Sequence, residues 1–150
     1  MKEVWKEIEG YEGIYQISES GKVKSLERYV DGRWGPILIK EKILSPITAG
    51  KRYKMVGLSK NSKTKFVNIH RLLAQTFINN PNNKLQVNHI DGNKMNNDLL
   101  NLEWVTPKEN IRHAWDNNLC ENTRIANSNR MKNLHKTKNK CLKNYQIESN

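Results

Sequence analysis

Residues 85–115 constrain the fold more than any other part of the chain, because short elements and turn signals alternate there over only thirty positions. The apolar stretch 85–90 predicts a β-strand, and the Asp-Gly-Asn run at 91–93 predicts the turn that ends it. After an Asn-rich loop, residues 102–105 predict a second short strand. The sequence therefore predicts two paired strands that lead into a helix.

Three residues mark the start of that helix. Thr106 can act as the N-cap, Pro107 suits the first helical position, and Glu109 completes a capping box with Thr106. Asn110 then falls in the first helical turn, beside the strand that carries His89 if the three elements pack together. One histidine and neighbouring amide groups converging on such a unit suit metal-assisted hydrolysis.

These residues resemble the HNH endonuclease motif in the form found in phage intron-encoded and free-standing homing endonucleases. The matching residues are Asn88-His89-Ile90-Asp91-Gly92-Asn93, Asn96-Asn97, Asn101-Leu102-Glu103-Trp104-Val105-Thr106 and Asn110. The resemblance extends upstream through 67–74 and Phe77, and it includes the string WKxIxGYEGxYxIS at residues 5–18. It covers roughly residues 3–115.

The resemblance implies an α+β fold with a ββα-metal (HNH, His-Me finger) nuclease core. Small antiparallel β-hairpin modules are expected before this core, and a basic, partly helical extension is expected after it. The corresponding divisions are residues 1–48, an N-terminal β module associated with DNA binding; residues 49–118, the HNH domain with a leading basic hairpin; and residues 119–150, the C-terminal extension.

In this reading His89 is the general base. The ordinary pKa of histidine lies near 6.5, so a neutral imidazole is available at neutral pH. Asn88 and Asn110 are the expected metal ligands, through their side-chain oxygens; in the resembling family the position of Asn88 often holds Asp, and the last position holds His or Asn. Oxygen ligands suit Mg²⁺ or Mn²⁺, which keep several waters, and one ion per site is expected.

Other polar residues near the site have expected structural roles. The Asn101 amide can tie the loop 93–100 to the strand carrying His89. Asp91 favours turn formation over metal binding, because Asp-Gly is a turn pair. His70, at a strand–helix junction, is expected to be a structural hydrogen-bonding residue rather than a ligand.

The composition of the chain limits which classes of partner it is expected to bind. The chain has 150 residues and a net charge of +11, with a pI near 9.7, which indicates a polyanionic partner. No apolar run is long enough to span a bilayer, and the N-terminus does not resemble a signal peptide. Cys120 and Cys141 form no CxxC pair, so a structural zinc site is not expected, and a reduced, cytoplasmic location is the simplest assumption.

Two hairpins are expected before the motif. Residues 14–17 and 22–26 form the first, with Gly21 supplying a positive φ in its turn, whereas residues 31–48 are expected to be a loop and a short strand. The second occupies residues 50–69, and no acidic residue lies between positions 42 and 90. This one-sided charge favours a phosphate-tracking ribbon over a merely solvated hairpin.

A short helix is expected at residues 70–78, from its apolar spacing. Residues 121–150 hold seven Lys or Arg against two acids, a net charge of +5, and are expected to order on DNA. The candidate DNA-binding residues are Lys51, Arg52, Lys54, Lys63, Lys65, Arg71, Lys94, Arg112, Arg124, Arg130 and Lys132.

The expected function is metal-dependent hydrolysis of phosphodiester bonds in duplex DNA, by nicking or cutting a specific site. The alternative is a sequence-specific DNA-binding protein whose HNH domain is inactive. Double-stranded DNA is the expected partner, with no membrane and no small-molecule substrate, and a monomer is expected because no heptad pattern or apolar interface is evident.

Overall fold

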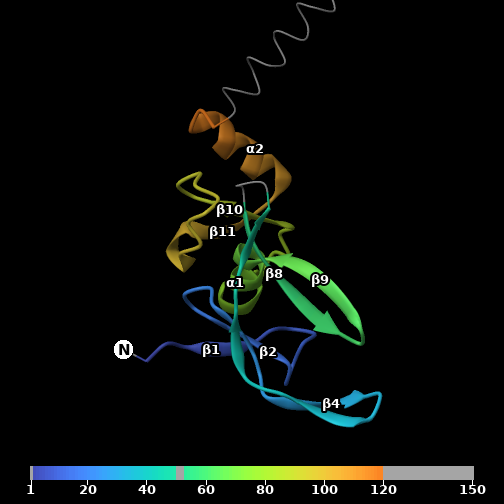
Figure 1. Cartoon of the computed structure of the whole chain (residues 1–150). Helices are drawn as coiled ribbons and strands as arrows, with labels where there is room; N and C mark the ends of the chain where they lie inside the picture. The colour runs from blue at the N-terminus through green and yellow to red at the C-terminus, as the bar shows by residue number, and fades with distance from the viewer. Residues whose placement is uncertain (1, 50–52, 120–150) are drawn as a thin grey trace, which may run out of the picture. The chain divides into compact units, whose positions relative to one another are not determined.

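The computed structural model describes residues 2–49 and 53–119 (Figure 1). Its contacts divide the chain into two units after Asn110, and each unit is treated by itself. Residues 2–110 contain both hairpin regions and the paired strands of the motif. The described part of the second unit is residues 111–119.

The N-terminal sheet has four antiparallel strands in the order β1-β2-β3-β6. Their bounds are β1 Trp5–Glu7, β2 Tyr15–Ser18, β3 Val23–Ser25 and β6 Lys42–Leu44. The predicted first hairpin is therefore confirmed. Gly21, in the turn between β2 and β3, has the predicted positive φ, of 80°.

The expectation of a loop and one short strand over residues 31–48 was wrong. β4 (Arg28–Gly32) and β5 (Gly35–Ile39) form a two-stranded hairpin of their own, and β7 (Ile47–Ala49) joins another sheet. The hairpin tip carries Trp34, which is 92% exposed. Most side chains of β5 are exposed, so its sequence lacks the alternation of apolar and polar residues that marks a half-buried strand.

The second predicted hairpin is confirmed as part of a three-stranded sheet, β7-β8-β9. β8 spans Tyr53–Lys60 and β9 spans Lys63–Asn68. The two residues between them, Asn61 and Ser62, have φ values of 53° and 59°, as a tight hairpin turn requires.

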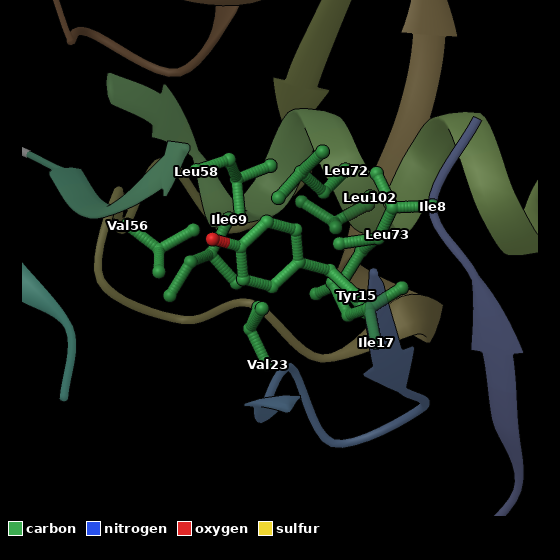
Figure 2. Packing of buried hydrophobic residues seen from close by; sticks show 10 residues of the cluster. All are labelled: Ile8, Tyr15, Ile17, Val23, Val56, Leu58, Ile69, Leu72, Leu73 and Leu102. Carbon is green, nitrogen blue, oxygen red and sulfur yellow. The ribbon is translucent and has the colours of Figure 1, made fainter. Parts of the chain in front are cut away.

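The predicted short helix is α1, Ile69–Phe77, which ends one residue before the expected end. Its buried face includes Ile69, Leu72 and Leu73. Figure 2 shows these side chains packed with Tyr15, Ile17 and Val23 of the N-terminal sheet, and with Val56, Leu58 and Leu102. One hydrophobic core therefore joins the N-terminal sheet, the β8-β9 hairpin and the motif strands.

The elements predicted for the motif are all present. β10 (Gln86–His89) pairs antiparallel with β11 (Leu102–Val105), and η1 (Leu99–Asn101) is a short 3₁₀ turn before β11. The helix α2 spans Pro107–Asp116. Its capping box is formed: the Thr106 N–H donates to Glu109 Oε2 at 2.7 Å, and the Glu109 N–H donates to Thr106 Oγ1 at 3.3 Å.

None of the helices in the described residues is long and apolar enough to cross a bilayer.

Candidate active site

Adjacent residues of β10 form the centre of the site. Asn88 is 7% exposed and His89 is 5% exposed. Because successive side chains of a strand point to opposite faces, these two residues serve two different surroundings.

On the His89 face, the imidazole has one polar neighbour and two ring neighbours. His89 Nε2 lies 3.3 Å from Oδ1 of Asn97, in the loop between β10 and η1. An amide oxygen can only accept, so this contact places the proton on Nε2 and leaves the lone pair on Nδ1. The His70 ring centroid lies 4.9 Å from that of His89 at 61°, and the Tyr53 ring centroid lies 6.2 Å away.

His70 is a buried, neutral histidine. It is 6% exposed, and burial, with smaller contributions from the nearby charges of His89 and Arg71, lowers its pKa to about 4. Its Nδ1 has no hydrogen-bond partner within the described residues. At Nδ1, therefore, the expected structural hydrogen bond is not found.

On the Asn88 face, two amide side chains are oriented by two acceptors. Asn88 Nδ2 donates to Glu103 Oε1 at 2.9 Å, and Asn110 Nδ2 donates to Gln86 Oε1 at 2.8 Å. Glu103 is the direct cross-strand partner of Asn88 in the β10-β11 register. Since the NH₂ group of each Asn is used in this way, the Oδ1 atoms are the ones available to a cation.

A network around Asn101 and Asp91 shapes the loop that follows β10. Asn101 Nδ2 donates to Asp91 Oδ1 and to the Asn96 carbonyl, both at 2.9 Å, and Asn101 Oδ1 accepts from the Asp91 N–H. Asp91 also accepts from the Asn93 N–H and from Asn96 Nδ2. Hydrogen bonds from Asn96 and Asn101 lower the pKa of Asp91. Both carboxylate oxygens are thus engaged within the turn.

The donor chemistry fits a weakly held, hard cation. In the part of the chain that the structure describes, no group of three or more His, Cys, Asp or Glu side chains is placed to hold a metal ion. Asn88 and Asn110 instead offer neutral amide oxygens, which suit Mg²⁺ or Mn²⁺ when other ligands come from water and phosphate.

The described candidate DNA-binding residues lie on several elements. Lys54 is on β8, Lys63 and Lys65 are exposed on β9, and Arg112 is in the second unit, on α2. Lys94 Nζ lies 5.5 Å from the Tyr53 ring centroid, and Arg71 donates to the Leu85 carbonyl at 3.4 Å. Lys51, Arg52, Arg124, Arg130 and Lys132, with nearly all of the predicted extension 119–150, lie outside the described residues.

Sequence reasoning missed Gln86, Glu103, Tyr53 and the contact of Asn97 with His89. Gln86 lies two positions before Asn88 on the same strand face, so the alternation of the strand could have predicted that it lies beside Asn88. Glu103 could be found from the strand register. No local pattern marks Tyr53, which reaches the site through tertiary packing.

Comparison with known proteins matches two segments of the chain to known families. Residues 67–112 match the HNH endonuclease family model, and residues 3–59 match the NUMOD4 motif. The chain contains an HNH endonuclease segment at residues 67–112. An uncharacterized HNH endonuclease of Acanthamoeba polyphaga mimivirus is 41% identical over 128 residues, which cover 83% of this chain and 29% of that protein. The DNA endonuclease I-HmuI of Bacillus phage SP01 is 38% identical over 109 residues, or 73% of this chain and 56% of that one.

A solved structure, described as DNA binding and cleavage by the HNH homing endonuclease I-HmuI, matches with a TM-score of 0.65 and 35% identity. The match covers 83% of this HNH chain and 66% of that chain. The ββα-metal core is therefore the fold of the motif. The chain spans 29% and 56% of the lengths of the two curated relatives named above.

Proposed function

We propose that this HNH protein is a metal-dependent endonuclease that hydrolyses phosphodiester bonds in duplex DNA, with His89 as the general base. The observation that supports this most is the buried imidazole of His89, whose Nε2 faces Asn97, together with two oriented amides, Asn88 of β10 and Asn110 of α2. The related I-HmuI structure is described as binding and cleaving DNA, which supports the same substrate.

In the proposed reaction, water attacks phosphorus, the bond from phosphorus to the 3′ oxygen breaks, and the 3′ oxygen leaves. His89 Nδ1 accepts the proton of the attacking water, since Nε2–H is directed to Asn97. Asn97 thereby fixes the tautomer, and Asn101 holds the loop that carries Asn97.

Asn88 and Asn110 would hold one Mg²⁺ or Mn²⁺ ion through Oδ1. Such an ion, when bound, would neutralise charge on the phosphate and stabilise the leaving 3′ oxygen. Both ligands are neutral, so they leave the ion's charge for the phosphate and bind it weakly without DNA. Glu103, which accepts a hydrogen bond from Asn88, adds a negative charge close to this site.

The basic residues on β8, β9 and the loop after β10 would hold the DNA backbone. Lys54, Lys63, Lys65 and Lys94 are the described Lys residues assigned to this role. One His89 per chain implies one strand cut in each binding event, so a monomer would nick, and a cytoplasmic site of action fits such a substrate.

The test is cleavage of supercoiled plasmids, including one that carries the cognate site, with Mg²⁺ or Mn²⁺. His89→Ala is expected to slow cleavage by about 10²- to 10⁴-fold, as loss of a general base does, with DNA affinity retained. His113→Ala, which removes a histidine from α2, is the matched control and should cleave normally. Unchanged cleavage by His89→Ala would remove His89 from the base role.

The alternative is a sequence-specific DNA-binding protein with an inactive HNH domain. The neutral Asn88, at a position where the resembling family often has Asp, favours this alternative. Binding of cognate DNA with no cleavage in either metal would support it.

A further inference from the structure

Four side chains form a cluster of contacts that includes the proposed base. Lys94 Nζ lies 5.5 Å from the Tyr53 ring centroid, and the Tyr53 and His70 centroids are 4.9 Å apart with an interplanar angle of 35°. His70 and His89 are also 4.9 Å apart, at 61°. These spacings and angles are those of offset and edge-to-face ring contacts.

His70 is anchored by the hydrophobic core. It is the second residue of α1, between Ile69, which is 4% exposed, and the core residues Leu72 and Leu73, which are 4% and 0% exposed. Movement of its ring away from His89 would require a rotamer change against these buried neighbours. In a close-packed core such a shift is unfavourable.

The hydrogen bond from His89 to Asn97 does not by itself fix the imidazole. Its length of 3.3 Å is beyond the usual range for an N–H···O bond, and a single bond leaves the ring free to tilt about it. A second contact on another side of the ring is needed to direct Nδ1. Of the two described rings beside His89, His70 at 4.9 Å is nearer than Tyr53 at 6.2 Å and is in position to supply that contact.

His70 suits a place beside a proton acceptor because it is uncharged there. Burial lowers its pKa to about 4, so at neutral pH it places no positive charge next to His89 when that residue takes up a proton. Its buried Nδ1 has no partner among the described residues, so hydrogen bonding at that atom does not explain its placement.

We propose that His70 is a positioning residue for catalysis: through edge-on ring contact it holds the His89 imidazole in the orientation that presents Nδ1 to the water, and the Tyr53 ring lies beside both histidines. This inference rests on the proposed function, because it assumes that His89 is the base. The ring of His70, rather than its nitrogen atoms, is what acts on His89.

The first experiment compares His70→Ala with His70→Phe in the full chain, by single-turnover cleavage and by DNA affinity. His70→Ala should cleave about 10- to 100-fold more slowly, the loss expected when a reacting group is misplaced by about 1 Å, while its Kd for DNA stays within twofold. His70→Phe keeps a ring and should stay within about threefold of the wild type, on the same reasoning.

Leu73→Ala is the control for instability. Leu73 lies on the same helix and is fully buried, but it has no ring contact with His89. All variants are assayed at a temperature at which circular dichroism shows them folded. Slow cleavage by His70→Ala together with normal cleavage by Leu73→Ala and His70→Phe supports the proposal. Equal losses in His70→Ala and His70→Phe, or no loss in either, overturn it.

A second measurement does not depend on cleavage. The ¹⁵N chemical shifts of the His89 imidazole should show one tautomer, with the proton on Nε2, in the wild type and in His70→Phe. In His70→Ala they should shift toward a mixture of tautomers as the ring loosens. An unchanged His89 spectrum in His70→Ala overturns the proposal. The ¹⁵N shifts can be measured even if the protein cleaves no DNA. They therefore distinguish failure of this inference from failure of the proposed function.

Discussion

The two faces of β10 position their side chains in different ways. His89 faces rings: His70 at 4.9 Å and Tyr53 at 6.2 Å, with one long contact to Asn97. On the opposite face Asn88 is oriented by a 2.9 Å hydrogen bond to Glu103. One residue of sequence therefore separates a side chain held chiefly by packing from one held chiefly by hydrogen bonding.

This difference implies two kinds of sensitivity. A ring contact depends on volume and shape, so an isosteric apolar ring can replace His70. The amide face depends on where acceptors lie, so Glu103 can be replaced only by a residue that also accepts a hydrogen bond. Mutations on each face can therefore show whether the contrast holds.

The largest effect is expected on the amide face at Asn88 itself. Asn88→Ala removes a proposed metal ligand and should reduce cleavage at least about 100-fold, since stabilisation of phosphate charge by a metal contributes several kcal/mol. DNA affinity, measured by fluorescence anisotropy without metal, should change less than about threefold, because DNA affinity comes mainly from phosphate contacts by basic residues.

Asn88→Asp is the matched control for that experiment. It restores a ligand and adds a negative charge, so half-maximal cleavage should occur at a lower Mg²⁺ concentration than in the wild type. If Asn88→Ala cleaves nearly as well as the wild type, Asn88 is not a metal ligand. The hydrogen bonding of the Asn88 face would then have no role in catalysis.

An intermediate effect is expected at Glu103. Glu103→Leu removes the acceptor that orients the Asn88 amide and should weaken Mn²⁺ binding to the protein–DNA complex about 10- to 100-fold, as loss of an outer-shell partner does. Glu103→Gln keeps an acceptor oxygen and should lose much less. Electron paramagnetic resonance of free Mn²⁺ measures both affinities, and equal losses in the two variants would show that charge, not amide orientation, is the role of Glu103.

The smallest effect concerns stability on the ring face. His70 has a pKa of about 4 in the folded protein, against about 6.5 for an exposed histidine. Between pH 4 and pH 6.5, His70 binds a proton in the unfolded chain but not in the folded chain. The free energy of unfolding therefore keeps its full value above pH 6.5 and falls as the pH drops toward 4. We expect a loss on the order of 2 kcal/mol over that window.

Urea denaturation at pH 7 and pH 5 measures this loss, with His70→Phe as the control. The phenylalanine variant cannot take up the proton, so its unfolding free energy should decline less between the two pH values. A decline identical to that of the wild type would assign the pH dependence to other groups.

Local chemistry explains which parts of this fold could be predicted. The second motif strand, 102–105, and the helix after it were predicted because turn and capping residues such as Thr106 and Glu109 act on their own neighbours in sequence. The hairpin of β4 and β5 was missed because β5, whose side chains are mostly exposed, carries no alternating pattern of apolar and polar residues.

The site could be predicted only in part, for a similar reason. His89, Asn88 and Asn110 stand in a recognisable motif. The ring contact between His70 and His89, however, joins α1 to β10 across nineteen positions of sequence and depends on the way the core brings those elements together. Such pairings follow from tertiary packing, which no short window of sequence specifies.

Gly21 allows the turn between β2 and β3 of the N-terminal sheet to pack directly against α1. A Cβ atom at this position would lie 3.1 Å from Ile69 Cγ2 and 3.4 Å from Leu73 Cδ1, so the β2-β3 turn packs closely on the helix that bears His70. The NUMOD4 and HNH segments are therefore not independent units, because they pack against each other in one hydrophobic core. A recombination event that joined an HNH segment to a foreign N-terminal segment would keep this packing only if the incoming turn also fitted closely against Ile69 and Leu73.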